Sequence, residues 1–300
     1  MVESSPRADQ LSSGSACLDL VGLSPLMART SGRPEISIAL IDGPVATNHP
    51  DLPAKNIREI SGDFAGSCNS GNTACAHGTF VAGVLIARRG SVAPAICPGC
   101  NLLVRPIFAE EIPEGEVVPR STAEQLAEAI IEVTDAGARI VNLSLAIQGP
   151  PSRGDSALEQ ALNHALRRGA VVVAAAGNQG AVGSSAITRH PWTIPVVAYD
   201  LRRLPMDISN LGASIGRCGL GAPGDAITSL GTMAKPVTMG GTSVATPFVT
   251  GAVALMWSEF PNATAAQVRS AVTQAGMRRR TTIVPPLMNA WAAYQAMSTV

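Results

Sequence analysis

The chain has 300 residues, of which 46% are hydrophobic, and its 22 basic residues balance 22 acidic ones. This length suffices for one large α/β domain or two small ones, and the hydrophobic content excludes intrinsic disorder over most of the chain. The balanced charge leaves no basic excess for binding a nucleic-acid backbone or an anionic bilayer. The longest apolar stretches are too short or too broken to cross a membrane. We therefore expect a soluble globular protein with neither nucleic acid nor a membrane as its partner.

The two ends of the chain differ in composition from the middle. Residues 1–17 are polar and rich in serine, so we predict a flexible N-terminal segment. Residues 278–300 are predicted to form an exposed, proline-containing linker and a short helix over 288–297. Residues 18–277 are predicted to fold as one domain. The first thirty residues carry charges and lack a continuous apolar core, so we expect no signal peptide and a cytoplasmic location.

Short apolar runs alternate with amphipathic segments along the predicted domain. The runs are typical of strands buried on both faces of a parallel sheet, and they cover residues 36–41, 102–107, 138–145, 170–176 and 193–198. Capping-box pairs predict three helix starts, at Thr122 with Gln125, Ser156 with Glu159, and Thr264 with Gln267. The alternation predicts an α/β fold with a doubly wound, mostly parallel central sheet flanked by helices. Such sheets place function in the loops beyond the carboxyl ends of their strands.

Asp42 and His77 stand in contexts that suit a catalytic pair. Asp42 ends the first predicted strand, where a partly desolvated carboxylate can orient a cation, although an Asx turn explains the same residue. His77 opens a segment that contains Gly78, Ala82 and Gly83, so a helix that begins there would pack closely and hold the imidazole in place. A lone histidine at a helix start is more often structural. Neither residue by itself establishes a function.

Ser243 and Asn178 also follow strand or turn signals. Ser243 comes after two glycines and falls at the start of a long apolar helix. A serine there is either a plain N-cap or a nucleophile whose own N–H stabilises an oxyanion at the positive end of the helix dipole. Asn178 follows the most strongly apolar strand, where an asparagine usually makes a turn. Beside an acyl-transfer serine, its amide would supply a second oxyanion donor.

The four residues together indicate a protein family far more specifically than any one of them does alone. Their order, Asp42, His77, Asn178 and Ser243, with each in its own small-residue context, resembles the subtilase family of serine peptidases over about residues 36–275. The resemblance implies that the predicted domain is a subtilisin-like peptidase domain. It implies that Ser243 attacks the scissile carbonyl, that His77 transfers the proton and that Asp42 orients the imidazole. The Asn178 amide and the Ser243 N–H would bind the oxyanion.

The resemblance also implies substrate-binding segments and no cofactor. The wall of the primary specificity pocket would be formed by Ser144, Leu145 and Ala146. The edge that pairs with an extended substrate would contain Phe108, Ala109 and Glu110. The connection over residues 88–100 carries no carboxylate, so it cannot build an oxygen-rich calcium loop, and no metal is expected.

The sequence departs from the usual subtilase pattern at two positions. Gly43 replaces the serine or threonine that usually follows the aspartate, and Phe80 replaces a second histidine. The run Asp42-Gly43-Pro44-Val45, followed by His49-Pro50 and later by Pro106-Ile107-Phe108, resembles the proteases that mature cyanobactin-type ribosomal peptides. The resemblance implies a peptide or small protein substrate, such as a ribosomal precursor whose leader is removed. His77 follows Asp42 by only 35 residues, which leaves little room for the helical insertion of macrocyclising relatives and favours hydrolysis over transamidation.

Three other functions compete with the peptidase interpretation. A pseudoprotease that binds a leader without cutting it would be favoured by a missing triad residue, and none is missing. A macrocyclising transamidase would share the same triad. A nucleotide-binding protein is indicated weakly by the glycines at 177, 180 and 183, but no helix follows them on which a phosphate could bind.

The six cysteines allow several interpretations. Cys97 and Cys100 could form a zinc site with Cys68 and Cys75, but the two pairs should lie at opposite edges of the sheet. Two local disulfides, 68 to 75 and 97 to 100, fit the predicted topology better. Free thiols are an equal alternative in a reducing compartment.

Overall fold

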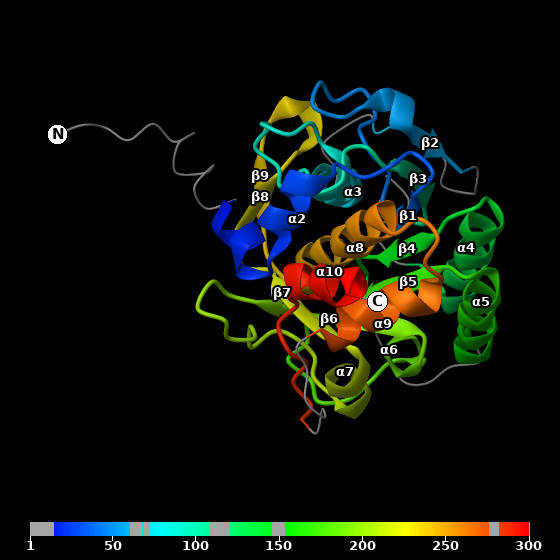
Figure 1. Cartoon of the computed structure of the whole chain (residues 1–300). Coiled ribbons are helices and arrows are strands. Elements are labelled where there is room, and N and C mark those ends of the chain that lie inside the picture. Colours follow the sequence, from blue (N-terminus) through cyan, green and yellow to red (C-terminus); the bar gives the residue numbers. More distant parts are fainter. Residues whose placement is uncertain are drawn as a thin grey trace.

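A computed structural model describes residues 15–60, 68, 73–108, 121–145, 154–275 and 282–299. The strands of its main sheet are β1 (Ser37–Asp42), β2 (Ile57–Glu59), β3 (Asn101–Pro106), β4 (Ile140–Leu143), β5 (Val171–Ala175), β6 (Thr193–Tyr199) and β7 (Leu220–Pro223). Their order in the sheet is β2-β3-β1-β4-β5-β6-β7, and every neighbouring pair is parallel (Figure 1). A separate antiparallel hairpin contains β8 (Ile227–Ser229) and β9 (Val237–Met239). The predicted α/β fold with a parallel central sheet is confirmed.

The position of β1 in the sheet places its C-terminal end at a crevice. β1 pairs with β3 on one side and with β4 on the other, so the chain leaves β1 toward one edge of the sheet and later returns to build the other. A reversal of this kind separates the connecting loops and opens a crevice beyond the carboxyl ends of the strands. Asp42 is the last residue of β1 and therefore lies beside this crevice.

Helices cover both faces of the sheet (Figure 1). They are α2 (Leu23–Arg29), α3 (Thr73–Ile86), α4 (Ala123–Asp135), α5 (Gly154–Arg168), α6 (Ala186–Arg189), α7 (Ala213–Cys218), α8 (Thr242–Glu259), α9 (Ala265–Gln274) and α10 (Ala290–Ser298). The predicted capping boxes that start α4 and α9 are confirmed by reciprocal hydrogen bonds. The predicted cap at Ser156 is wrong, because α5 begins two residues earlier and the Ser156 hydroxyl accepts a hydrogen bond from Gln160 within the helix.

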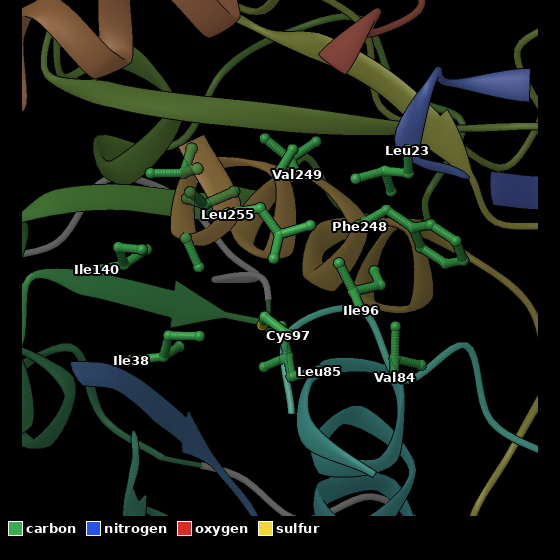
Figure 2. Close-up of a cluster of buried hydrophobic side chains, with 14 of the residues drawn as sticks. Leu23, Ile38, Val84, Leu85, Ile96, Cys97, Ile140, Phe248, Val249 and Leu255 are labelled. Carbon is green, nitrogen blue, oxygen red and sulfur yellow. The ribbon is translucent and has the colours of Figure 1, made fainter. Parts of the chain in front are cut away.

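Alternate residues of each central strand enter different hydrophobic clusters. In β1, Ile38 and Leu40 pack into the cluster that contains α3 and α8, whereas Ala39 and Ile41 pack into the cluster that contains α4 and α5. This alternation follows from the two-residue period of a strand, which points successive side chains to opposite faces. Figure 2 shows part of the first cluster, where Phe248 of α8 lies near Leu23 of α2 and Ile96. Burial on both faces explains why the strands are continuous apolar runs.

The central helix α8 is buried over nearly its whole length. Sixteen of its residues are buried, and they occur on every side of the helix. Its buried hydroxyl groups are satisfied within the protein: Thr246 donates to the carbonyl of Thr242 at 2.7 Å, and Ser258 donates to that of Ala254 at 2.8 Å. A helix enclosed in this way is held rigidly by close packing. The residues at its N-terminus are therefore fixed relative to the sheet.

The C-terminal segment does not form the exposed linker that the sequence predicts over residues 284–288, whereas Thr282 and Ile283 are exposed as predicted. Pro286 accepts a hydrogen bond from the N–H of Gly221 at 2.6 Å, and Met288 donates to the carbonyl of the same glycine at 2.8 Å. The Tyr199 hydroxyl donates to the carbonyl of Pro285, which is buried. The segment is ordered because β7 is an edge strand whose backbone groups need partners. The rest of the predicted linker, residues 278–281, lies outside the described residues.

At the other end, residues 15–20 are helical and the side chain of Cys17 is buried. The predicted flexible segment, 1–17, therefore extends too far by at least three residues, because Cys17 enters the main hydrophobic cluster. Residues 1–14 lie outside the described part.

Among the helices that the structure describes, none has the length and apolar character that a membrane span requires.

Candidate active site

The Asp42 carboxylate is held at the end of β1 and is only 1% exposed. Its Oδ1 accepts a hydrogen bond from the N–H of Gly43 at 2.7 Å and another from Nδ1 of His77, also at 2.7 Å. Its Oδ2 is buried and has no hydrogen-bond partner among the described residues. The carboxylate is thus desolvated, and its charge acts mainly on the His77 imidazole.

His77 lies one turn inside α3, which begins at Thr73 and not at the histidine as the sequence predicts. The first turns of α3 pack directly on the backbone that follows β1. A Cβ atom at Gly43 would collide with the backbone carbonyl of Ala74, and one at Gly78 would collide with the carbonyls of Gly43 and Pro44. The absence of both side chains lets the helix approach β1 closely enough for the His77–Asp42 hydrogen bond. This contact also explains why position 43 holds glycine where serine or threonine is usual.

The environment of His77 raises the pKa of its imidazole. Burial of the ring lowers this pKa, but the nearby Asp42 charge and the hydrogen bond from Nδ1 raise it by more, so the net direction is upward. A quarter of the side-chain surface remains exposed. Because Nδ1–H donates to the carboxylate, the other ring nitrogen, Nε2, carries the free lone pair of the neutral imidazole. The ring can therefore accept a proton at Nε2.

A disulfide joins Cys68 to Cys75. Cys75 lies in the turn of α3 that precedes His77. The Cα atoms of the two cysteines are 5.7 Å apart, a usual separation for a disulfide. This pairing is one of the two that the sequence suggests. The other is wrong: Cys97 and Cys100 are free, and both are buried beside Gly32.

The described residues contain no group of three or more histidine, cysteine or acidic side chains that could hold a metal ion. The zinc site considered from the sequence would need both cysteine pairs together. The pairs instead occupy different places, one at the start of α3 and the other directly before β3.

Ser243 is the second residue of α8, immediately after Gly241 and Thr242. The first N–H groups of a helix have no partner within the helix. Here the N–H of Thr242 donates to Asn178, and those of Val244 and Ala245 both donate to the carbonyl of Gly241. Among the described residues nothing accepts from the N–H of Ser243, so this donor is free at the positive end of a long helix.

The side chain of Asn178 is oriented by Thr242. Its Oδ1 accepts hydrogen bonds from both the N–H and the hydroxyl of Thr242, each at 2.9 Å. Because these two donors fix the oxygen, the amide nitrogen Nδ2 must point the other way, and no described residue accepts from it. Gly241, at φ +121°, leaves room for this amide, since a Cβ there would lie 3.0 Å from Nδ2. Two free donors, Asn178 Nδ2 and the Ser243 N–H, therefore flank the start of α8.

The structure joins the predicted catalytic residues in two groups. Asp42 is hydrogen-bonded to His77, and Asn178 is bound to the residue that precedes Ser243. Helices α3 and α8 pack against each other and bring the two groups to one end of the sheet. The Ser243 hydroxyl makes no hydrogen bond to His77 or to any other residue that the structure describes. Catalytic hydrogen bonds are often long without substrate and tighten when it binds.

Three of the predicted substrate-binding residues can be placed. Ser144 follows β4 and is buried, and its hydroxyl accepts a hydrogen bond from Nδ2 of Asn142 at 2.8 Å. Leu145 and Phe108 are partly buried and pack against the cluster that contains α4 and α5. The three remaining predicted residues, Ala146, Ala109 and Glu110, lie outside the described residues.

Sequence reasoning missed the residues that hold these groups in place. Thr242 orients Asn178, and only its position beside Ser243 could have indicated a role. Thr250 of α8 donates to Oδ1 of the fully buried Asn142 at 2.7 Å and so supports Ser144. Asn210 binds the backbone on the far side of Asn178. Nothing in a single sequence links residues so far apart.

A serine at a helix N-terminus, an imidazole–carboxylate pair and two unused N–H donors are the components of acyl transfer through a tetrahedral oxyanion. Together with the parallel sheet they define an α/β serine peptidase. Residues 33–285 match the model of the subtilase family. The chain belongs to the subtilase family.

Relatives and solved structures agree with this assignment. The chain is 31% identical to subtilisin DY of Bacillus licheniformis over 241 residues, which cover 78% of this chain and 81% of that protein. It is 33% identical to a thermophilic serine proteinase of Bacillus sp. strain AK1 over 248 residues, which cover 82% of this chain and 57% of that protein. The resemblance to subtilases is therefore confirmed.

Among solved structures, the protease domain of PatA is similar, with a TM-score of 0.80 and 29% identity over 89% of this chain and 97% of that one. The prenylagaramide maturation protease PagA has a TM-score of 0.79 and 26% identity, over 91% of this chain and 98% of that one. The PatG macrocyclase domain, at 20% identity and a TM-score of 0.79, shows the same fold. The predicted similarity to peptide maturation proteases is confirmed at the level of structure.

Proposed function

We propose that this serine peptidase hydrolyses peptide bonds with Ser243 as nucleophile, His77 as general base and acid, and Asp42 as the group that orients His77. The Ser243 Oγ bonds to the scissile carbonyl carbon while His77 Nε2 takes its proton. His77 then returns the proton to the amine as the C–N bond breaks, and water releases the acyl group by the same route. Asn178 Nδ2 and the Ser243 N–H bind the oxyanion. The observation that carries this proposal is the 2.7 Å hydrogen bond from Nδ1 of His77 to the buried Asp42.

The first test is covalent labelling with a fluorophosphonate, followed by intact mass. We expect one adduct on the native protein and none on the Ser243→Ala variant, because only an activated serine reacts. Ser258, which is buried in the same helix α8 and donates to the carbonyl of Ala254, supplies the matched control: Ser258→Ala should keep the adduct. A folded native protein without an adduct, or an adduct that persists in Ser243→Ala, would refute the assignment of Ser243.

We further propose that the substrate is a peptide precursor, of which the enzyme removes a leader segment. The similarity to PatA and to the maturation protease PagA supports this substrate class. The short connection between Asp42 and His77 supports hydrolysis over ring closure. A precursor gene beside the gene for this chain would be further support.

A library of peptides from a digested proteome tests this substrate class by mass spectrometry. A maturation protease should cut few of the peptides, at one shared motif, and each cut should add one water to the summed product masses. Cleavage of many unrelated peptides would contradict the proposal. Cyclic products, which retain no added water, would point to transamidation.

The cytoplasmic location stays a prediction, which cell fractionation can test.

A further inference from the structure

The loop that carries Asn178, residues 177–183, is paired along its length with the segment 207–212. We call these the Asn178 loop and the support segment. The N–H of Asn210 donates to the carbonyl of Gly177, and the N–H of Leu211 donates to that of Ala181, both at 2.9 Å. The N–H of Gly180 donates to the carbonyl of Ile208 at 2.8 Å. The two segments therefore move together.

The support segment is itself fixed to the sheet. Ser209, directly before Asn210, is buried, and its hydroxyl accepts a hydrogen bond from the N–H of Ala198 in β6 at 3.2 Å. The N–H of Met206 donates to the carbonyl of the same alanine at 2.8 Å. Because β6 lies inside the sheet, Asn210 is held by the most rigid part of the protein.

The side chain of Asn210 makes three hydrogen bonds, all to the Asn178 loop. Its Oδ1 accepts from the N–H of Gln179 at 3.1 Å and from that of Ala181 at 3.0 Å, and its Nδ2 donates to Oε1 of Gln179 at 2.7 Å. The amide also packs on Gly177, where a Cβ would collide with Nδ2. Asn210 thus contacts both chain neighbours of Asn178.

The other contact that fixes Asn178 comes from Thr242, which lies on the side opposite Asn210. Thr242 binds its Oδ1, but this contact fixes only the end of the side chain. The backbone of residue 178 lies between residues that Asn210 contacts, and Gly177 at φ +107° gives that backbone unusual freedom. Without the Asn210 amide, the turn would have conformations in which Nδ2 points away from the position of the oxyanion.

We propose that Asn210 is a positioning residue for peptide hydrolysis, which holds the backbone of residues 177–181 so that the Asn178 amide meets the developing oxyanion. The inference rests on the proposed role of Asn178 as an oxyanion donor. Asn210 acts through Asn178 and not on the substrate. Its loss should therefore weaken binding of the transition state more than binding of the ground state.

The test is a double-mutant cycle on the full chain, with kcat and KM measured on a fluorogenic peptide taken from the sequences that the native protein cuts. We expect Asn178→Ala to lower kcat about 100-fold, since this is a usual loss for one oxyanion donor. We expect Asn210→Ala to lower kcat about tenfold and to leave KM within about twofold. In the Asn178→Ala background, Asn210→Ala should have no further effect, because the group that it positions is gone.

The matched control is Asn289→Ala. Asn289 also binds a backbone N–H through its side chain, at the start of α10, a helix that packs against α2 and α9, and kcat should not change. Thermal unfolding of each variant confirms that it folds. If Asn210→Ala does not fold, Asn210→Ser replaces it, since the shorter hydroxyl cannot reach both N–H groups.

The results of the cycle distinguish a failure of the inference about Asn210 from a failure of the proposed role of Asn178. If Asn178→Ala keeps the native kcat, the oxyanion role of Asn178 fails and the inference falls with it. If Asn178→Ala is slow but Asn210→Ala is as fast as the native protein, only the inference is overturned. Equal effects of Asn210→Ala in both backgrounds would also overturn it, because they would show that Asn210 acts independently of Asn178.

Discussion

Nδ1 of His77 lies 2.7 Å from Oδ1 of Asp42, although 35 residues separate them in the chain. One belongs to a helix and the other ends a strand of the central sheet. Their contact depends on helix α3 approaching the end of β1 over two glycines. The chemistry of the site, its pH dependence and its sensitivity to substitution follow from this contact.

The raised pKa of His77 should be visible in solution. The protein has four histidines, so their imidazole proton resonances can be resolved by NMR. We expect the His77 resonance to titrate at a pH above about 6.5, the ordinary imidazole value. Because only the neutral ring accepts a proton, kcat/KM should fall on the acid side with the same midpoint.

Asp42→Asn should move this titration to lower pH, because it removes the charge that raises the pKa and leaves the burial that lowers it. The rate should fall by about four orders of magnitude. His49 and His190, whose pKa values are lowered by burial, are internal controls that should titrate below about 6.5 in both proteins. A His77 titration that is unchanged in Asp42→Asn would contradict the role of the carboxylate.

Gly43→Ser should damage both stability and activity, although serine is the usual family residue at this position. The new Cβ would collide with the Ala74 carbonyl and push α3, with His77, away from Asp42. We expect a loss of about 1–3 kcal/mol in the free energy of unfolding, as for other overpacked sites, and a lower kcat. Gly183→Ser is the control for stability, since a Cβ at Gly183 meets no atom within 4 Å. An equal loss in the urea unfolding of the two variants would refute this account.

Reduction of the Cys68–Cys75 disulfide should loosen the first turn of α3. The bridge closes a loop with a sequence separation of 7. A loop of this length stabilises the fold by about 2 kcal/mol in the chain-entropy account. We expect dithiothreitol to lower the unfolding midpoint and kcat of the native protein. The double variant Cys68→Ser, Cys75→Ser should start at these lower values and not respond to the reagent. Alkylation of both cysteines in unfolded, unreduced protein would show that the bridge does not form.

Thr250→Val should destabilise the protein although the two side chains have the same shape. It would leave Oδ1 of the fully buried Asn142 without its hydrogen bond from Thr250. An unpaired buried acceptor costs about 1–3 kcal/mol. Thr246→Val on the same helix should cost less, about 1 kcal/mol or below, because the Thr246 hydroxyl only adds a bond to a helix carbonyl. Denaturant titration of the two variants gives the comparison, and a reversed order would contradict it.

The sequence by itself determined the fold class and the position of the main strands. The five apolar runs all became strands of the parallel sheet, because a strand buried on both faces must be apolar at every position. Two of the three predicted helix caps formed, since a cap depends on residues three apart in the chain. The sequence missed β2 and β7, which are short edge strands with weak local patterns, and the β8–β9 hairpin. It also predicted an exposed linker where the chain packs along β7.

Local patterns also picked out the four candidate catalytic residues, because each stands where a strand or helix boundary leaves a recognisable motif. Only the tertiary structure decided what holds them. Three contacts join segments that lie far apart in the chain. They are the contact between Gly43 and the start of α3, the hydrogen bonds from Thr242 to Asn178, and the hydrogen bonds between Asn210 and the Asn178 loop. Their geometry follows from how helices pack on the sheet, and packing depends on all the side chains of the core at once. A single sequence therefore shows which groups can react, and the assembled fold decides which donors remain free to act.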